Sequence, residues 1–164
     1  MSVKNQPLNM TILFTRHAIA LDHAIAQRKK ISDDDRPLTP AGIRAFEAII
    51  QRHKKKIKKT DLYMSSPLLR AQQTLALMMT SKKSRKHKPK NYKYIRHSDS
   101  PSQFLKWIKK TKFENIVAVS HEPYMSHFMA ALFGDQWLNH KIKKGQIIKI
   151  KFSGEKISYK LLPL

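Results

Sequence analysis

The sequence predicts an α/β fold: a three-layer sandwich in which a mixed, mainly parallel sheet lies between helices and ends in an antiparallel hairpin. Short apolar runs alternate with amphipathic segments along most of the 164 residues, a pattern typical of α/β proteins. Several amphipathic segments begin with a serine or threonine followed by proline, which is a helix-start signal. The last two apolar runs are joined through Ser153 and Gly154, which predicts the hairpin.

The predicted strands are short runs of apolar residues. The first run, MTILFT at residues 10–15, predicts a strand that is buried on both faces. The run NIVAVS at residues 115–120 has the clearest strand pattern in the chain. The remaining predicted strands are residues 62–64, 92–96, 146–152 and 156–162.

The predicted helices follow the helix-start signals. Thr39 is the expected N-cap of a helix in which Pro40 takes the first position, and the far end of this helix (HKKKIKK) is strongly basic, as suits a helix C-terminus. Serine followed by proline also precedes a helix at residues 68–79 and another that begins near residue 101, and Pro123 opens the last helix. The side chains expected to face the core are those of Ile43, Phe46, Ile49, Ile50, His53, Ile57, Phe104, Leu105, Ile108, Met125, Phe128, Met129 and Leu132.

The composition predicts a single folded domain that spans residues 1–164. Hydrophobic residues make up 41% of the chain, and no shift in composition marks a domain boundary. The absence of cysteine excludes a disulfide framework, a thiolate metal site and a cysteine nucleophile. No apolar run approaches the roughly 18–20 residues of a membrane span. Residues 1–9 are polar and carry no apolar signal core, so we expect a cytoplasmic protein.

The chain is strongly basic, with 33 Lys and Arg against 11 Asp and Glu and a formal net charge of +22. Such a charge attracts anions in general: nucleic acid, an acidic membrane surface, or phosphorylated and acidic proteins. It is equally compatible with a proteome that is basic throughout. The run KKSRKHKPK at residues 82–90 is expected to form a surface loop, and residues 1–8 and 21–35 are the other segments expected to be mobile.

Three segments that carry arginine or histidine each follow a predicted strand. They are Thr15-Arg16-His17, the run SSPLLR that ends at Arg70, and Ser120-His121-Glu122-Pro123. In open α/β sheets, ligands bind beyond the carboxyl ends of the strands, so these side chains are expected to converge at one edge. Arginine offers planar paired donors for phosphate oxygens, helix N-termini add free N–H groups, and a histidine beside the phosphorus can attack it. The sequence therefore predicts a phosphoryl-binding pocket.

Taken in order, these motifs resemble the histidine phosphatase superfamily, and its small branch, the SixA-type phosphohistidine phosphatases, fits best. The resemblance rests on Arg16-His17, on RPLT at residues 36–39 with Gly42, on SSPLLRAQQT at residues 65–74, and on SHEP at residues 120–123. It extends from residue 11 to about residue 133. Each motif alone is a weak signal, but all four in this order are a strong one.

The resemblance implies a role for each matching residue. His17 matches the nucleophile that becomes phosphorylated, and Arg16 and Arg70 match the arginines that hold the phosphoryl group. His121 matches the second histidine, which contacts the phosphate and stabilises the transition state. Arg36 is expected to fix a loop or an ion pair, or to contact the substrate. The six other histidines are expected to be surface or packing residues: His23, His53, His87, His97, His127 and His140.

The sequence departs from the family pattern in two respects. The family reads Arg-His-Gly, and here Ala18 takes the third position, which matters only if that position needs a positive φ. The small branch also lacks the carboxylate that larger relatives use as a general acid, and Glu122, Asp22 and Asp99 are the nearest candidates here. An alkoxide leaving group needs a proton, whereas imidazole, with a pKa of about 6.5, leaves readily. A site without a dedicated acid therefore favours phosphohistidine over sugar phosphates.

These observations predict a metal-independent protein phosphohistidine phosphatase without a cofactor, in which water hydrolyses a phospho-His17 intermediate. The expected partner is a phosphohistidine on a phosphorelay or phosphotransfer protein, and the expected state is a monomer. One alternative is a phosphatase of small phosphomonoesters or nucleotides. Another is a basic module with weak activity that binds nucleic acid or anionic lipid. Nucleic acid is not favoured, because the chain has no recognisable RNA-binding or helix-turn-helix motif.

Overall fold

A six-stranded mixed sheet forms the centre of the molecule. The computed structural model describes residues 8–79, 89–91, 95–96 and 98–164. The strands are β1 (Asn9–Arg16), β2 (Leu62–Ser65), β3 (Lys90–Asn91), β4 (Asn115–Ser120), β5 (Ile147–Ser153) and β6 (Lys156–Leu161). Their order across the sheet is β3-β2-β4-β1-β5-β6. The pairs among β1, β2, β3 and β4 are parallel, and β5 and β6 run antiparallel to their neighbours.

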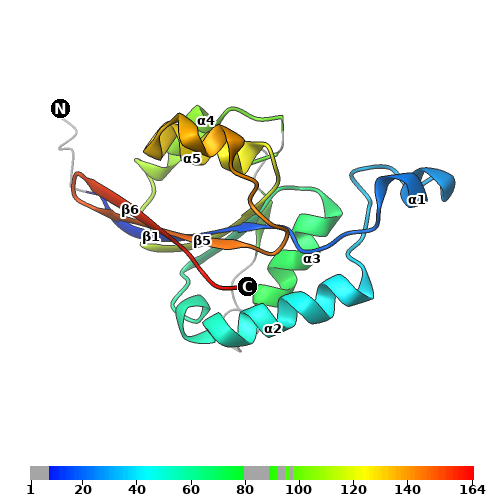
Figure 1. Cartoon of the computed structure of the whole chain (residues 1–164). Coiled ribbons are helices and arrows are strands. Elements are labelled where there is room, and N and C mark those ends of the chain that lie inside the picture. Colours follow the sequence, from blue (N-terminus) through cyan, green and yellow to red (C-terminus); the bar gives the residue numbers. More distant parts are fainter. Residues whose placement is uncertain (1–7, 80–88, 92–94, 97) are drawn as a thin grey trace.

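Helices cover both faces of this sheet, which confirms the predicted three-layer arrangement. Helices α2 (Pro40–Ile57) and α3 (Leu69–Met78) lie on one face. Helices α4 (Pro101–Ile108) and α5 (Tyr124–Phe133) lie on the other, as Figure 1 shows. A short helix, α1 (His23–Arg28), projects beyond the end of the sheet, and a 3-10 helix, η3 (Asp135–Asn139), follows α5.

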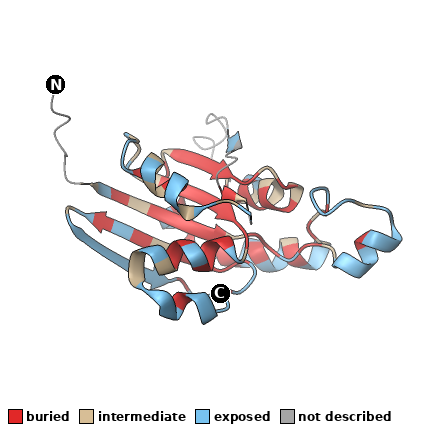
Figure 2. Ribbon diagram, turned by 90° about the horizontal axis from the view of Figure 1, so that it is seen from above, coloured by how far each residue is buried: buried red, intermediate tan, exposed pale blue. Residues whose placement is uncertain are grey.

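The central strand β1 separates two hydrophobic clusters, one on each face of the sheet. Ile12 and Phe14 pack with α4 and α5, whereas Leu13 packs with α2 and α3. This alternation explains why residues 12–14 at the centre of β1 are all apolar, as predicted for a strand buried on both faces. Figure 2 shows the buried central strands beside the exposed edge strand, and every residue of β6 is exposed.

The predicted C-terminal hairpin is confirmed. Strands β5 and β6 pair in register from Ile148 with Leu161 to Ser153 with Lys156. Gly154 occupies the turn with a φ of 63°, in the left-handed region that favours glycine.

The motif that begins at Arg36 fixes the start of α2 against the chain that leaves β1. The Thr39 hydroxyl accepts a hydrogen bond from the Gly42 N–H at 2.9 Å, and the Thr39 N–H donates to the Ile19 carbonyl. Gly42 permits this close approach, because a Cβ at that position would lie 2.2 Å from the Ile19 oxygen. The motif thereby ties the segment after β1 to the first turn of α2.

Most of the strand predicted at residues 92–96 lies outside the described residues, which omit 92–94; the two positions that are described, Ile95 and Arg96, lie outside any strand. Ile95 is fully buried, and its carbonyl accepts a hydrogen bond from the Ser120 hydroxyl. The apolar residue at this position is therefore explained by burial and not by an extended backbone. Residues 21–35, predicted to be mobile, contain α1, which begins where the Asp22 carboxylate accepts the Ala24 and Ile25 N–H groups. Most of the basic run at residues 82–90 lies outside the described residues.

Among the described residues, no helix combines the length and the apolar character needed to cross a membrane.

Candidate active site

The carboxyl ends of three parallel strands meet at one edge of the sheet. In the register of the sheet, Arg16 at the end of β1 is paired with Ser120 at the end of β4, and Ser65 at the end of β2 is paired with Val119. The next residues of each segment therefore enter the same space. They line a cavity of about 400 Å³ together with residues of the α1–α2 and η3–β5 loops. Its lining residues are Arg16, His17, His23, Asp33, Arg36, Arg70, His121, Glu122 and Lys144.

His17 is held as a neutral, oriented imidazole. The residue is only 6% exposed, and its Nδ1 lies 2.7 Å from the carbonyl oxygen of Ala18, to which it donates a hydrogen bond. This contact leaves the lone pair on Nε2. Burial lowers the pKa of His17 to about 3, and the positive charges of Arg70, Arg16 and Lys144 act in the same direction, while the Ala18 hydrogen bond opposes them. His17 is therefore unprotonated at neutral pH, the form in which imidazole is a nucleophile.

Arg16 and Arg70 each present a buried N–H group without a protein partner. The Nε atoms of both guanidinium groups are buried and form no hydrogen bond with the described residues. The other nitrogens are anchored: Arg16 donates from Nη1 to the Ile142 carbonyl, and Arg70 donates from Nη1 to the Asp33 carbonyl at 2.6 Å. Burial lowers the pKa of both groups, which nearby carboxylates partly offset, and arginine stays charged in proteins. A buried N–H group without a hydrogen-bond partner lowers the stability of the fold. An oxyanion in the cavity would accept hydrogen bonds from both Nε–H groups.

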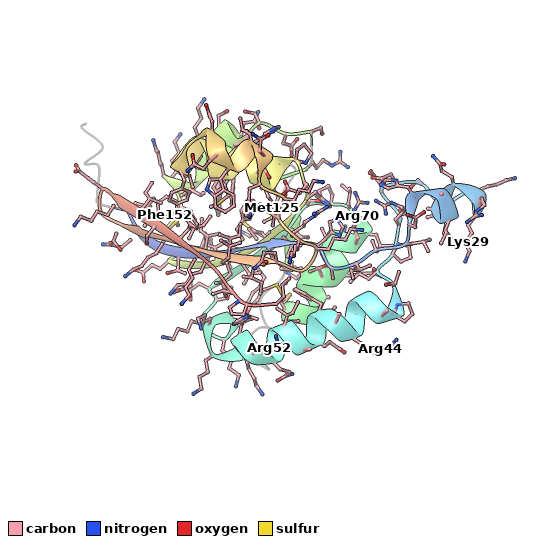
Figure 3. The ribbon with its side chains drawn as sticks, in the orientation of Figure 1. Lys29, Arg44, Arg52, Arg70, Met125 and Phe152 are labelled. Atoms are coloured by element: carbon pink, nitrogen blue, oxygen red, sulfur yellow. The ribbon has the colours of Figure 1, made fainter. Side chains whose placement is uncertain are left out.

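Arg70 is positioned by the first turn of α3. Figure 3 shows it at the end of the sheet that faces α1. Thr74, one turn later, donates its hydroxyl to the Arg70 carbonyl and accepts the Ala18 N–H at 3.0 Å. The SSPLLRAQQT segment therefore ties the residue that follows His17 to the helix that carries Arg70.

His121 lies beside His17, with their ring centroids 5.1 Å apart. Its Nε2 is 2.5 Å from the Ser66 hydroxyl, which also accepts the Leu68 N–H. Ser66 was predicted as a helix cap, and it instead links the start of α3 to His121. The two histidines and two arginines predicted from the sequence thus share one cavity, with exposures of 6% or less for His17, Arg70 and His121.

Asp33 is a site residue that the sequence analysis missed. Its carboxylate accepts Arg36 Nε at 2.8 Å and Arg70 Nη2 at 3.0 Å, and it lies 3.4 Å from His23 Nδ1. Burial raises the pKa of Asp33, but the hydrogen bonds and charges of Arg36 and Arg70 outweigh this and lower it overall. Asp33 is followed by two more aspartates, so the sequence does not show which of them reaches the cavity.

Two further residues line the cavity. His23 is exposed, as predicted, and it also lines the cavity, where its Nε2 lies 3.0 Å from Arg36 Nη2. Lys144 enters the lining because the Gly145 N–H donates to the carbonyls of Arg16 and His17, which docks the η3–β5 loop on the end of β1. Neither residue had a recognisable sequence signal.

The three candidate carboxylates do not form a general acid at the centre of the cavity. Glu122 lines the cavity, but its oxygens accept hydrogen bonds from the N–H groups of Ser126 and Ile142 and from the Ser126 hydroxyl. Asp22 caps α1, where the Ala24 and Ile25 N–H groups lower its pKa, and Asp99 accepts the Arg96 N–H. Asp22 and Asp99 are not among the residues that line the cavity.

Ala18, where the family has glycine, is compatible with the local backbone. Among the described residues other than glycine, only Lys30 has a positive φ, so Ala18 does not need glycine's conformational freedom. Its methyl group is 2% exposed and joins the cluster under α2 and α3. In the described part of the chain, no three His, Cys, Asp or Glu side chains are grouped so that they could hold a metal ion.

Comparisons with known proteins agree with this arrangement. Residues 12–91 match the family model of the histidine phosphatase superfamily (branch 1), a segment that contains both Arg16-His17 and Arg70. Over this segment the chain is similar to the histidine phosphatase superfamily. An uncharacterized protein of Picosynechococcus sp. is 28% identical over 152 residues, which cover 90% of this chain and 88% of that protein.

Solved histidine phosphatases of the SixA type share the fold. The structure assigned as phosphohistidine phosphatase SixA from Agrobacterium tumefaciens matches with a TM-score of 0.72 and 19% identity, over 91% of this chain and 97% of that one. The protein histidine phosphatase SixA complexed with tungstate matches with a TM-score of 0.70 and 20% identity, over 92% and 94%. Phosphoserine phosphatase from Entamoeba histolytica also shares the fold, with a TM-score of 0.69 and 14% identity, over 93% and 96%. At these identities the likeness establishes the fold and not the substrate.

Proposed function

We propose that this protein is a phosphohistidine phosphatase that works through a phospho-His17 intermediate. Residues 12–91 match the histidine phosphatase superfamily model, and two solved structures named as SixA histidine phosphatases share this fold. The observation that carries the proposal is the pairing of a buried, neutral His17 with the two unpartnered guanidinium N–H groups of Arg16 and Arg70. This combination offers a nucleophile and two fixed donors for a phosphoryl dianion.

In the first step, Nε2 of His17 attacks the phosphorus, and the bond from phosphorus to the substrate nitrogen breaks. The departing imidazole keeps the bonding electron pair and takes up a proton from solvent. Arg16, Arg70 and His121 hold the phosphoryl oxygens and stabilise the charge of the transition state. In the second step, water attacks phospho-His17, and inorganic phosphate and neutral His17 are released.

The two carboxylates that line the cavity are both held by hydrogen bonds: Asp33 accepts from Arg36 and Arg70, and Glu122 accepts from Ser126 and Ile142. Neither is a ready proton donor, which supports an N-phosphoryl substrate. Imidazole is a good leaving group near neutral pH, whereas an alkoxide departs slowly without a general acid. We expect a phosphohistidine on a phosphorelay or phosphotransfer protein as the substrate.

A phosphatase of small phosphomonoesters is the second candidate, because a phosphoserine phosphatase shares the fold. Turnover of a phosphohistidine peptide should be compared with that of phosphoserine, a sugar phosphate and a nucleoside monophosphate. A general acid typically raises the rate by about 10²–10⁴-fold. A site without one should therefore show a kcat/KM for phosphohistidine at least about 100-fold above that for the three esters. The opposite order would favour the second candidate.

The decisive experiment is to trap the phosphoenzyme. The protein should be mixed with excess phosphohistidine peptide, quenched in alkali to preserve the P–N bond, and mapped by mass spectrometry. The phosphoryl group should appear on His17. His127→Ala, an exposed histidine on α5, is the matched control and should give the same adduct. An adduct on any other residue, or none during turnover, would rule out the proposed intermediate.

A further inference from the structure

The mouth of the cavity carries charged groups that the catalytic steps above do not use. His17, Arg70 and His121 form the buried floor, with exposures of 6%, 4% and 2%, whereas the Asp33 side chain is 41% exposed. The attacking and leaving atoms lie roughly in line in phosphoryl transfer. Because the nucleophile is on the floor, the leaving group must point toward the mouth, where Asp33 lies.

We propose that Asp33 is a specificity-determining residue: its carboxylate selects substrates whose leaving group is neutral or positively charged, such as the imidazole of phosphohistidine, over substrates whose leaving group carries a carboxylate. The inference rests on the proposed function in taking His17 as the nucleophile. Asp33 is well placed for this role, because its partners Arg36 and Arg70 hold the carboxylate in one position at the rim. A carboxylate on the substrate would meet a like charge there, and a protonated imidazole would meet an opposite charge.

Asp33 also orients Arg70, so its removal changes phosphoryl binding as well as the charge at the mouth. The effect on phosphoryl binding applies equally to every substrate, because all of them present the same group to Arg70. The effect of the Asp33 charge on the leaving group is therefore seen only in the ratio of the binding constants of two ligands whose leaving groups carry opposite charges. The test must therefore compare two ligands that differ in that charge alone.

Phosphoethanolamine and phosphoglycolate form such a pair, because each carries its charged group, ammonium or carboxylate, two carbons from the ester oxygen. Their inhibition constants against aryl phosphate hydrolysis should be measured for wild type and Asp33→Asn. We expect Asp33→Asn to strengthen the binding of phosphoglycolate relative to phosphoethanolamine by about tenfold, as the loss of a unit charge at the mouth implies. Asp33→Glu keeps the charge and should stay near the wild-type ratio.

Two further variants make the comparison specific. Lys144→Gln removes a positive charge from the lining of the same cavity, so it should shift the ratio in the opposite direction. Glu155→Gln removes an exposed carboxylate at the β5–β6 turn, at the other end of the sheet, and should leave the ratio unchanged. An unchanged ratio in Asp33→Asn, or an equal shift in Glu155→Gln, would overturn the proposal.

The readout separates this inference from the proposed function. If wild type hydrolyses neither phosphohistidine nor aryl phosphate, the proposed function fails, and the same ratio is then taken from calorimetric dissociation constants. If wild type is active but the ratio does not respond to Asp33→Asn, only the role of Asp33 fails. If neither small ligand binds the cavity, the inference is overturned.

Discussion

At the carboxyl-terminal edge of the sheet, positive charge is carried by buried arginines, whereas at the far end of α2 it is carried by exposed lysines. Arg36 and Arg70 are 6% and 4% exposed and are fixed by hydrogen bonds to Asp33. The far end of α2 borders another cavity, of about 260 Å³, at the opposite end of the parallel strands. Its lining includes Lys55 and Lys56 of α2, Lys59 just after the helix, and Lys149; the first three are exposed.

Each cavity is lined by four Lys or Arg side chains, but the two differ in how these side chains are held. Lysine ammonium groups on flexible stems keep their hydration, so they attract anions without fixing them in one geometry. The buried guanidinium N–H groups of Arg16 and Arg70 have no partner to give up before an oxyanion binds. In a chain with a net charge of +22, the number of cations does not identify the site, whereas burial and fixed donors do.

The largest expected effect is the loss of phosphatase activity when His17 is replaced. His17→Ala should lower kcat by at least about 1,000-fold, because it removes the covalent step. The fold should persist, since His17 lies at a strand end beside the cavity and belongs to neither hydrophobic cluster. Phosphatase assays with circular dichroism check both statements. Lys55→Ala, in the other cavity, serves as the control, and near-normal turnover by His17→Ala would refute the mechanism.

Oxyanion binding tests which cavity holds the phosphoryl group. Tungstate, vanadate or phosphate should raise Tm by mass action, and Arg70→Ala should weaken that binding by about 10–100-fold, as loss of a charge-assisted contact implies. The double variant Lys55→Ala/Lys59→Ala should respond as wild type does. Equal stabilisation of wild type and Arg70→Ala would show that anions bind the general basic surface. Added chelator should change neither activity nor Tm, because we predict no metal.

The pH dependence tests the burial of His17. Its pKa is about 3 in the folded protein and about 6.5 when unfolded. The unfolded state therefore binds a proton that the folded state does not, so stability is lost as pH falls from about 6.5 toward 3. Wild type should lose more Tm between pH 7 and pH 4.5 than His17→Gln, as calorimetry can measure. His17 should also stay unprotonated over this range, so an activity loss centred near pH 6.5 and caused by His17 would contradict its burial.

The smallest expected effect concerns the lysine-rich run at residues 82–90. For an acidic phosphotransfer protein as substrate, kcat/KM should fall several-fold as salt rises, because exposed charges are screened beyond about 8–10 Å. The value of kcat should stay nearly flat, since the contacts that we propose between the arginines and the phosphoryl group are made inside the cavity at short range. Neutralising several lysines of the run at residues 82–90 should reproduce part of the fall without changing turnover of a small phosphoramidate. If the lysine variant and wild type had equal kcat/KM on the protein substrate at low salt, the run would have no role in attracting that substrate.

Much of the fold was predictable because its signals are local. The apolar runs gave β1, β2, β4 and the hairpin, and Thr39-Pro40 marked the start of α2. Ile95 was wrongly assigned to a strand, because a buried isoleucine has the same apolar signature in a strand as in an irregular segment. Helix α1 was missed because its six residues depend on the Asp22 cap and on the docking of the following loop, with only Ala26 buried.

The sequence by itself determined which residues are candidates for the chemistry, and the tertiary structure decided how they are held. Arg16, His17, Arg70 and His121 stand in recognisable motifs at strand and helix ends, and parallel strands bring such ends to one edge. The roles of Asp33 and Lys144 come from loops that fold back on the strand ends, through contacts between residues far apart in the sequence. Local patterns cannot encode these contacts, because an exposed aspartate or lysine has the same local sequence signature whether or not a loop carries it into a cavity.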